Sequence, residues 1–125
     1  MLQSSPLYAY LPAKDVKRAR AFYEGKLGFV AHEGKGGGVF YEFGNGTAAF
    51  LYPTPNAGTN QASTAFWKVG DIEKTVADLK AKGVTFERYD FPQGKMTSDI
   101  AEGGGAKAAW FKDSEGNTLA VIQDM

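Results

Sequence analysis

The sequence Leu-Tyr-Ala-Tyr-Leu-Pro-Ala-Lys-Asp-Val at residues 7–16 aligns without a gap on Ser-Thr-Ala-Phe-Trp-Lys-Val-Gly-Asp-Ile at residues 63–72, at an offset of 56 (71 − 15). Each copy is an extended stretch that runs into an Asp, a residue favoured at helix N-caps. The mostly apolar positions that follow have the i, i+3, i+4, i+7 spacing of an amphipathic helix. Each predicted helix stops before a glycine, Gly28 or Gly83, suited to the left-handed C′ position. The chain is therefore predicted to contain two copies of a strand–helix unit.

A second internal match places residues 38–52 over residues 108–122 at an offset of 70 (108 − 38). Each copy consists of a strand, a glycine-containing turn and another strand, which predicts a hairpin. The two offsets differ by 14 (70 − 56), so the second copy carries extra residues between its helix and its hairpin. The extra residues fall in residues 86–107, where glycines and a proline predict a long loop or lid over residues 89–105.

These matches predict one α+β domain over residues 1–125, built from two tandem βαβββ modules. The boundaries are module one at 1–53, a linker at 54–61 and module two at 62–125. Residues 30–36 and 84–88 are candidates for the remaining strand of each module.

Composition excludes several classes of function. The chain has 14 basic and 14 acidic residues, so it lacks the net positive charge that is typical of nucleic-acid-binding proteins. It has no cysteine, so it can form neither a disulfide nor a cysteine-ligated metal site. Its N-terminus has no export signal, and no apolar run approaches the length of a membrane-spanning helix, which is about 20 residues. We expect a cytoplasmic protein with no nucleic-acid or membrane partner.

Strand alternation predicts which face of each sheet the aromatic residues occupy. A three-residue loop ending at Gly116 would pair Trp110 with Ala120 and Phe111 with Leu119, and paired residues share a face. The helix side is then assigned Leu7, Ala9, Leu11, Ala65, Trp67, Val69, Phe111, Leu119 and Val121. The helix-free side is assigned Tyr8, Tyr10, Phe40, Phe50, Tyr52, Thr64, Phe66 and Trp110. So many aromatic residues require a cover, which is the other module, a second subunit or a bound ligand.

Three motifs resemble the vicinal oxygen chelate superfamily: Asp-Val-x-Arg-Ala-x-x-Phe-Tyr at 15–23, Leu-Gly-Phe at 27–29, and Phe-x-Asp-Ser-Glu-Gly-Asn at 111–117. That superfamily includes glyoxalase I, extradiol dioxygenases and bleomycin-resistance proteins. The resemblance implies an incomplete barrel around a central cleft, often completed by dimerisation, so we expect a homodimer.

The resemblance also implies four metal-ligand positions, which fall on Tyr8, Phe50, Thr64 and Ala120. None of these side chains offers the imidazole or carboxylate that a divalent ion needs, so no metal and no other cofactor is expected. The single histidine, His32, is interpreted as a surface or strand-edge residue. Glu42, Lys68 and Lys112 are candidates for an acid–base pair, although solvated charges at strand ends are the simpler interpretation.

The favoured hypothesis is a metal-free binding protein, similar to the bleomycin-resistance branch, that sequesters a flat aromatic or conjugated ligand such as a natural-product antibiotic. The ligand would stack on Trp110 between the modules, with the loop and its Met96 closing over it. The ligand-binding residues would be Tyr8, Tyr10, Phe40, Phe50, Tyr52, Thr64, Phe66, Met96 and Trp110, with no catalytic residue. Two alternatives stay open: a metal-dependent lyase, isomerase or dioxygenase with unidentified ligands, and an interaction module whose aromatic face a partner chain buries.

Overall fold

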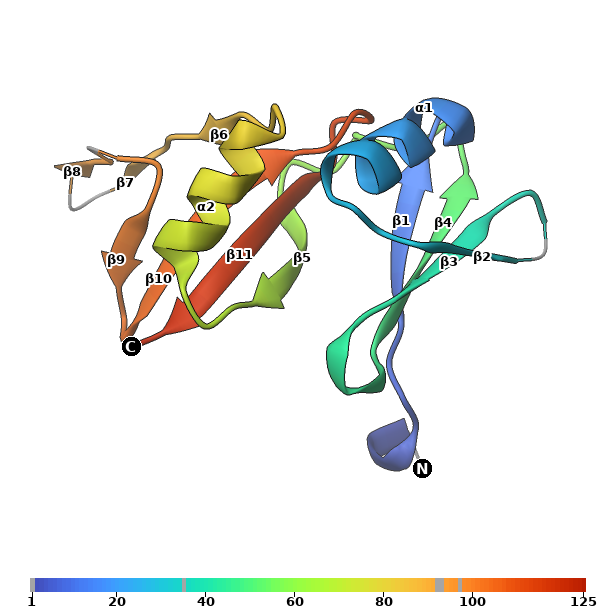
Figure 1. The fold of residues 1–125 in the computed structure, drawn as a ribbon, viewed down its shortest axis with the longest axis horizontal. Coiled ribbons are helices and arrows are strands. Elements are labelled where there is room, and N and C mark those ends of the chain that lie inside the picture. The colour runs from blue at the N-terminus through green and yellow to red at the C-terminus, as the bar shows by residue number, and fades with distance from the viewer. Residues whose placement is uncertain (1, 35, 92–93, 97) are drawn as a thin grey trace.

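The computed structural model describes residues 2–34, 36–91, 94–96 and 98–125, which form two mixed sheets with helices and no closed barrel. Figure 1 shows the two modules side by side, the first in blue and green and the second from yellow-green to red. The predicted α+β class and the two βαβββ modules are confirmed.

Module one contains a four-stranded sheet of order β1-β4-β3-β2, in which β1 and β4 are parallel. Its strands are β1 (Ala9–Ala13), β2 (Ala31–Glu33), β3 (Val39–Glu42) and β4 (Ala48–Pro53). Its helical segments are η1 (Leu2–Ser4), α1 (Val16–Arg20), the π-helical η2 (Ala21–Lys26) that continues α1, and η3 (Gly44–Gly46).

Module two contains a sheet of order β5-β11-β10-β6, with β9 also paired to β10. Its elements are β5 (Ser63–Lys68), α2 (Ile72–Ala81), β6 (Phe86–Glu87), β9 (Ala101–Gly103), β10 (Ala106–Lys112) and β11 (Thr118–Asp124). A separate two-stranded ribbon is made of β7 (Asp90–Phe91) and β8 (Gly94–Lys95). The segment 89–105, predicted as a long loop, thus holds three short strands, because β9 pairs with β10 and β7 with β8.

Helix ends follow the predicted signals. The side chains of Asp15 and Asp71 cap α1 and α2 by accepting from the backbone N–H three residues later, at 3.0 and 3.1 Å. Gly28 and Gly83 adopt φ values of 76° and 91°, which non-glycine residues rarely reach. The predicted hairpin register is also confirmed, with Trp110 opposite Ala120, Phe111 opposite Leu119 and Gly116 at φ 86°.

The core joins the helix sides of both sheets. Its largest fully buried side chains come from both modules: Leu11, Tyr23, Tyr41, Leu51, Ile72, Phe111 and Leu119. Phe22 meets Phe111 with ring centroids 6.5 Å apart, and Phe29 meets Trp67 at 5.6 Å. The prediction that Trp67 packs on the helix side is confirmed, whereas Leu7, assigned to the same side, precedes β1 and is 84% exposed.

A buried polar junction also joins the modules at the 113–117 turn. Figure 1 shows this turn, in red, reaching the start of α1. Glu115 accepts from the backbone N–H groups of Lys14 and Asp15 at 2.9 and 3.0 Å, and from the Arg18 guanidinium at 2.8 and 2.9 Å. The bond from Arg18 is the main reason that the pKa of Glu115 is lowered to about 2. The ion pair therefore holds β10 and β11 against the helix of the other module.

No helix in the described ranges is long and apolar enough to cross a membrane.

Candidate functional site

A cluster of aromatic side chains covers the helix-free face of the module-one sheet. The register of β1, β4 and β3 aligns Tyr10, Phe50 and Phe40 in one row across the sheet. Phe50 lies 4.8 Å from Phe40, and Tyr10 lies 4.9 Å from Tyr52, measured between ring centroids. These rings share a face because they occupy alternate positions of their strands. We call Tyr10, Phe40, Phe50 and Tyr52 the aromatic face.

Glycines make room for the central ring of this face. A Cβ at Gly34 would come within 2.7 Å of the Phe50 ring, and a Cβ at Gly38 would come within 2.8 Å. The Phe50 ring therefore extends over the β2–β3 connection, where larger side chains would displace it.

The aromatic face is partly open to solvent, since Phe40, Phe50 and Tyr52 are half-buried. Tyr10 is 67% exposed, and Tyr8, which directly precedes β1, is 54% exposed. Exposed rings of this size are unusual on a soluble monomer and typically mark a surface that binds a ligand or another chain.

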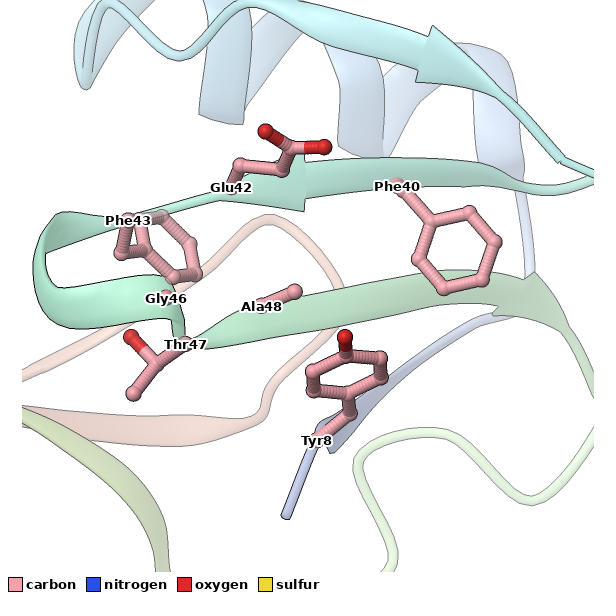
Figure 2. Close-up of a pocket in the computed structure, with 7 residues that line it drawn as sticks. All are labelled: Tyr8, Phe40, Glu42, Phe43, Gly46, Thr47 and Ala48. Carbon is pink, nitrogen blue, oxygen red and sulfur yellow. The ribbon is translucent and has the colours of Figure 1, made fainter. Parts of the chain in front are cut away.

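A pocket of about 370 Å³ lies beside this face, at the end of the β3–β4 hairpin. It is lined by Tyr8, Phe40, Glu42, Phe43, Gly46, Thr47 and Ala48. Figure 2 shows Tyr8, Phe40 and Glu42 arranged around Ala48, which is opposite Glu42 in the strand register. The small Ala48 side chain leaves the space that the neighbouring rings enclose.

Polar groups in the pocket come from the ends of the hairpin. The Thr47 hydroxyl donates to the Gly44 carbonyl at 3.2 Å, which leaves its lone pairs free to accept from a ligand. The Tyr8 hydroxyl and the Glu42 carboxylate supply the remaining polar atoms of the described lining side chains. The pocket thus combines ring faces with hydrogen-bond acceptors.

The module-two sheet carries a second, separate aromatic group. Trp110 meets Tyr89 at 5.5 Å and Phe91 at 6.0 Å between ring centroids. Ala120 lies between Phe66 and Trp110 in the register and is 1% exposed, although it is on the helix-free face. Phe66 itself is 56% exposed.

Thr64 and Met96 have local structural contacts. The Thr64 hydroxyl donates to the Thr118 carbonyl at 3.2 Å. Met96 exchanges contacts with Tyr89, because its backbone N–H donates to the Tyr89 carbonyl and its sulfur accepts from the Tyr89 N–H, both at 3.4 Å. Within this chain, Met96 lies against the segment that reaches Trp110, and it does not line the pocket beside Phe40.

The predicted residues therefore divide into two groups on two sheets. The expectation that Trp110, Tyr8, Phe50 and Phe66 surround one site between the modules is not met within a single chain. The physical reason is that the space between the modules is filled by core contacts such as Phe22–Phe111 and Phe29–Trp67. Alternation predicts the face of each ring correctly, but it does not determine how the two sheets face each other.

Sequence reasoning also missed pocket residues in the β3–β4 turn. Phe43, Gly46 and Thr47 line the pocket. The internal match at the offset of 70 was a signal for this turn, because it makes residues 43–47 the module-one equivalent of residues 113–117. His32 is exposed on the edge strand β2, as expected, but it is the register partner of Phe40 and so shares the aromatic face. That pairing could not be read from alternation alone.

The four positions of the family metal ligands hold no clustered donors. Tyr8 and Phe50 belong to module one, and Thr64 and Ala120 belong to the module-two strands β5 and β11. Among the described residues, no group of three or more His, Cys, Asp or Glu side chains could hold a metal ion. Lys68 forms an ion pair with Asp124 at 2.7 Å, so it is engaged within its own sheet.

Comparison with known proteins places this geometry in a family. A family model described as the Glyoxalase/Bleomycin resistance protein/Dioxygenase superfamily matches residues 6–121. No curated protein matches the chain significantly.

Solved structures match over nearly the whole chain. UcmS2 has a TM-score of 0.74 at 18% identity, covering 95% of this chain and 97% of its own. TnmS3, an antibiotic-binding protein from Streptomyces sp. CB03234, has a TM-score of 0.74 at 21% identity, covering 100% and 99%. Lactoylglutathione lyase from Agrobacterium tumefaciens has a TM-score of 0.66 at 16% identity, covering 96% and 93%. At these identities, the likeness establishes the fold, which both binding proteins and enzymes share.

Proposed function

The chain belongs to the Glyoxalase/Bleomycin resistance protein/Dioxygenase superfamily, and from this premise we propose that it sequesters a flat aromatic small molecule on its aromatic face. A natural-product antibiotic is the ligand class that we propose, with binding in the cytoplasm as the means of resistance. The fold of the antibiotic-binding protein TnmS3 supports the proposal, since its TM-score to this chain is 0.74.

The observation that carries the proposal is an open pocket beside a partly exposed set of aromatic rings. The pocket has a volume of about 370 Å³, which accommodates a small planar ring system. Each offset or edge contact with Tyr8 or Phe40 would contribute about 0.5 to 1.5 kcal/mol beyond burial. Sequestration requires affinity alone, so it needs none of the catalytic groups that an enzyme of this fold must supply.

We also propose that binding requires no metal. Tyr8, Phe50, Thr64 and Ala120 occupy the four positions that carry ligands in metal-dependent relatives, and none is a good ligand for a divalent ion. Elemental analysis of the purified protein after dialysis against a chelator tests this point. Zinc, nickel, manganese or iron near one equivalent per chain would contradict it.

We propose that a second copy of the chain covers those parts of the helix-free faces of the two sheets that the ligand leaves exposed. Tyr10 and Phe66 are both more than half exposed, and they lie on the helix-free faces of different sheets. A homodimer could bring the module-one face of one copy against the module-two face of the other. Sedimentation equilibrium should then give twice the chain mass, and a monomer at all concentrations would contradict the homodimer.

Fluorescence titration with acridine, an uncharged planar ring at neutral pH, tests the binding function. Phe40→Ala should weaken binding by about tenfold, because the ring forms one wall of the pocket. Val30→Ala is the matched control, since Val30 is an exposed apolar residue that does not line the pocket. Equal affinities for Phe40→Ala and the unmodified protein would contradict this location of the site.

Trp110→Ala tests whether the second aromatic group contributes. If two copies enclose one ligand between them, this variant should also lose affinity, by about 1 to 3 kcal/mol. If the ligand is held by module one alone, affinity should be unchanged, and the role in binding predicted for Trp110 would be wrong.

A further inference from the structure

We propose that the pocket selects planar ligands that carry a positive charge, and that the Glu42 carboxylate makes this selection. The inference rests on the proposed function, because it concerns the ligand that the same pocket takes. It specifies the chemical class of that ligand: an aromatic ring system that carries an ammonium, amidinium or ring-nitrogen cation.

Charge in the pocket has a single sign. Of the seven described residues that line it, Glu42 is the only one with an ionisable acid or base other than the Tyr8 phenol. Glu42 is exposed, it is opposite Ala48 in the register, and it lines the pocket from β3; Figure 2 shows its carboxylate on the other side of that strand from the Tyr8 ring.

The Glu42 carboxylate has no arginine partner among the described residues, whereas the carboxylates of Glu24 and Glu115 do. Glu24 is bound by Arg20 at 2.7 Å, which lowers the pKa of Glu24, and Glu115 is bound by Arg18 at 2.8 Å. For Glu42, no ion pair or hydrogen bond with another described side chain is found. Its charge is therefore available to a ligand, whereas Arg18 and Arg20 are engaged with Glu115 and Glu24.

The remaining lining groups also favour a cation. The faces of Tyr8 and Phe40 carry the negative side of an aromatic quadrupole, which attracts a positive charge within about 6 Å. The Thr47 oxygen accepts hydrogen bonds after donating its own proton to Gly44, so it suits the N–H groups of a protonated amine. An anion would instead meet the Glu42 carboxylate and the negative faces of the rings.

The equivalent position of module two carries the opposite charge. Lys112 is related to Glu42 by the offset of 70 (112 − 42) and lies opposite Thr118 in the register. Lys112 is exposed on the same kind of helix-free hairpin, so it is a matched control for a substitution that removes one charge without altering the core.

The test compares 9-aminoacridine, which is a cation at neutral pH, with acridine, which is neutral and has the same ring system. The unmodified protein should bind 9-aminoacridine about fivefold more tightly at low salt, the effect of one solvent-exposed charge interaction. Glu42→Gln should abolish the preference by weakening 9-aminoacridine binding, and Lys112→Gln should retain it. The preference should also shrink as salt shortens the range of the interaction.

The outcomes separate this inference from the function on which it rests. Equal binding of the two probes to the unmodified protein, or a preference that survives in Glu42→Gln, would overturn the inference alone. Loss of the preference in Lys112→Gln to the same degree as in Glu42→Gln would also overturn it, because the Glu42 carboxylate would then not be the group that recognises the charge of the ligand. If neither probe binds, the proposed function itself would be overturned.

Discussion

The two hairpin turns occupy equivalent places in the modules, yet they join the modules by different chemistry. The 113–117 turn makes a polar junction, in which Tyr23 donates to Asp113 and Asn117 donates to the Pro12 carbonyl at 2.8 Å. The 43–47 turn makes an apolar one, in which Phe43 meets Trp67 with ring centroids 5.6 Å apart. Phe43 and Asp113 are related by the offset of 70 (113 − 43).

The difference shows how an internal repeat becomes specialised. The buried Asp113 and Glu115 need many partners, so the 113–117 turn is fixed against its neighbours. The 43–47 turn meets the other module through the Phe43 ring, while Gly46 and Thr47 line the pocket. One turn stabilises the arrangement of the modules, and the other contributes to the candidate site.

Trp67→Ala should have the largest effect, because it removes the apolar junction. We expect a loss of about 3 to 4 kcal/mol in the free energy of unfolding, typical of truncating a large aromatic residue in a core. Trp110→Ala should cost less than half as much, since Trp110 packs on Tyr89 and Phe91 outside the core. Urea unfolding of both variants measures the difference. A larger loss of stability for Trp110→Ala would show that Trp110, and not Trp67, is the core residue.

Glu115→Gln should break the polar junction at a cost of about 2 to 3 kcal/mol. The side chain is fully buried, and it loses its charge-assisted bonds to Arg18 and to two backbone N–H groups. Glu102→Gln is the control, because the exposed Glu102 carboxylate lies 3.7 Å from Lys107 and should contribute less than about 0.5 kcal/mol. Similar unfolding curves for the two variants would show that the 113–117 turn does not hold the modules together.

Acid should weaken the same junction without any mutation. The folded pKa of Glu115 is lowered from 4.5 to about 2, so ionised Glu115 stabilises the fold above pH 4.5, and this stabilisation declines as pH falls toward 2. Between pH 5 and pH 3 the unmodified protein should lose about 2 kcal/mol from this residue. Subtracting the pH profile of Glu115→Gln isolates the contribution, and parallel profiles would contradict it.

Tyr23→Phe should cost about 1 to 2 kcal/mol, because it removes the hydroxyl that donates to the buried Asp113. Burial and the Asp113 charge raise the pKa of Tyr23, so the hydroxyl keeps its proton throughout the neutral range. Tyr8→Phe is the control, since Tyr8 is exposed and should leave stability unchanged. Thermal unfolding distinguishes the two, and an unchanged midpoint for Tyr23→Phe would remove this bond from the junction.

Asn45→Gly should have the smallest effect, a change of no more than about 0.5 kcal/mol, because glycine readily adopts the φ of 60° found at Asn45. Asn45 is the module-one equivalent of Glu115, so the comparison of the two positions tests directly how far the turns differ. Loss of more than 1 kcal/mol in urea unfolding would show that the 43–47 turn depends on its side chains as well.

Local pattern predicts much of this molecule. The two offsets give both modules, the caps at Asp15 and Asp71 give the helix starts, and the left-handed Gly116 gives the hairpin register. These features depend on residues close in the sequence, where spacing and backbone preference act directly. The strands inside 89–105 were missed because they are two or three residues long and gain stability from neighbouring strands.

The candidate site is predicted less completely, because it depends on contacts between distant residues. Alternation identifies Tyr8 and Phe40 as helix-free residues, and both line the pocket. It does not predict that Glu115 binds Arg18, 97 positions away, or that this junction fixes how the two sheets lie. For that reason the sequence groups Trp110 with the module-one rings, although the chain holds it on the other sheet.

In the described part of the chain, each of the two main sheets takes all its strands from one half of the sequence, and no ladder of backbone hydrogen bonds crosses between the sheets. Side chains alone therefore set the angle between the halves. Substitutions in these side chains should tilt one aromatic surface relative to the other while both sheets stay intact. The exposed rings of the two halves can therefore be realigned by a few substitutions at the junction, without rebuilding either sheet.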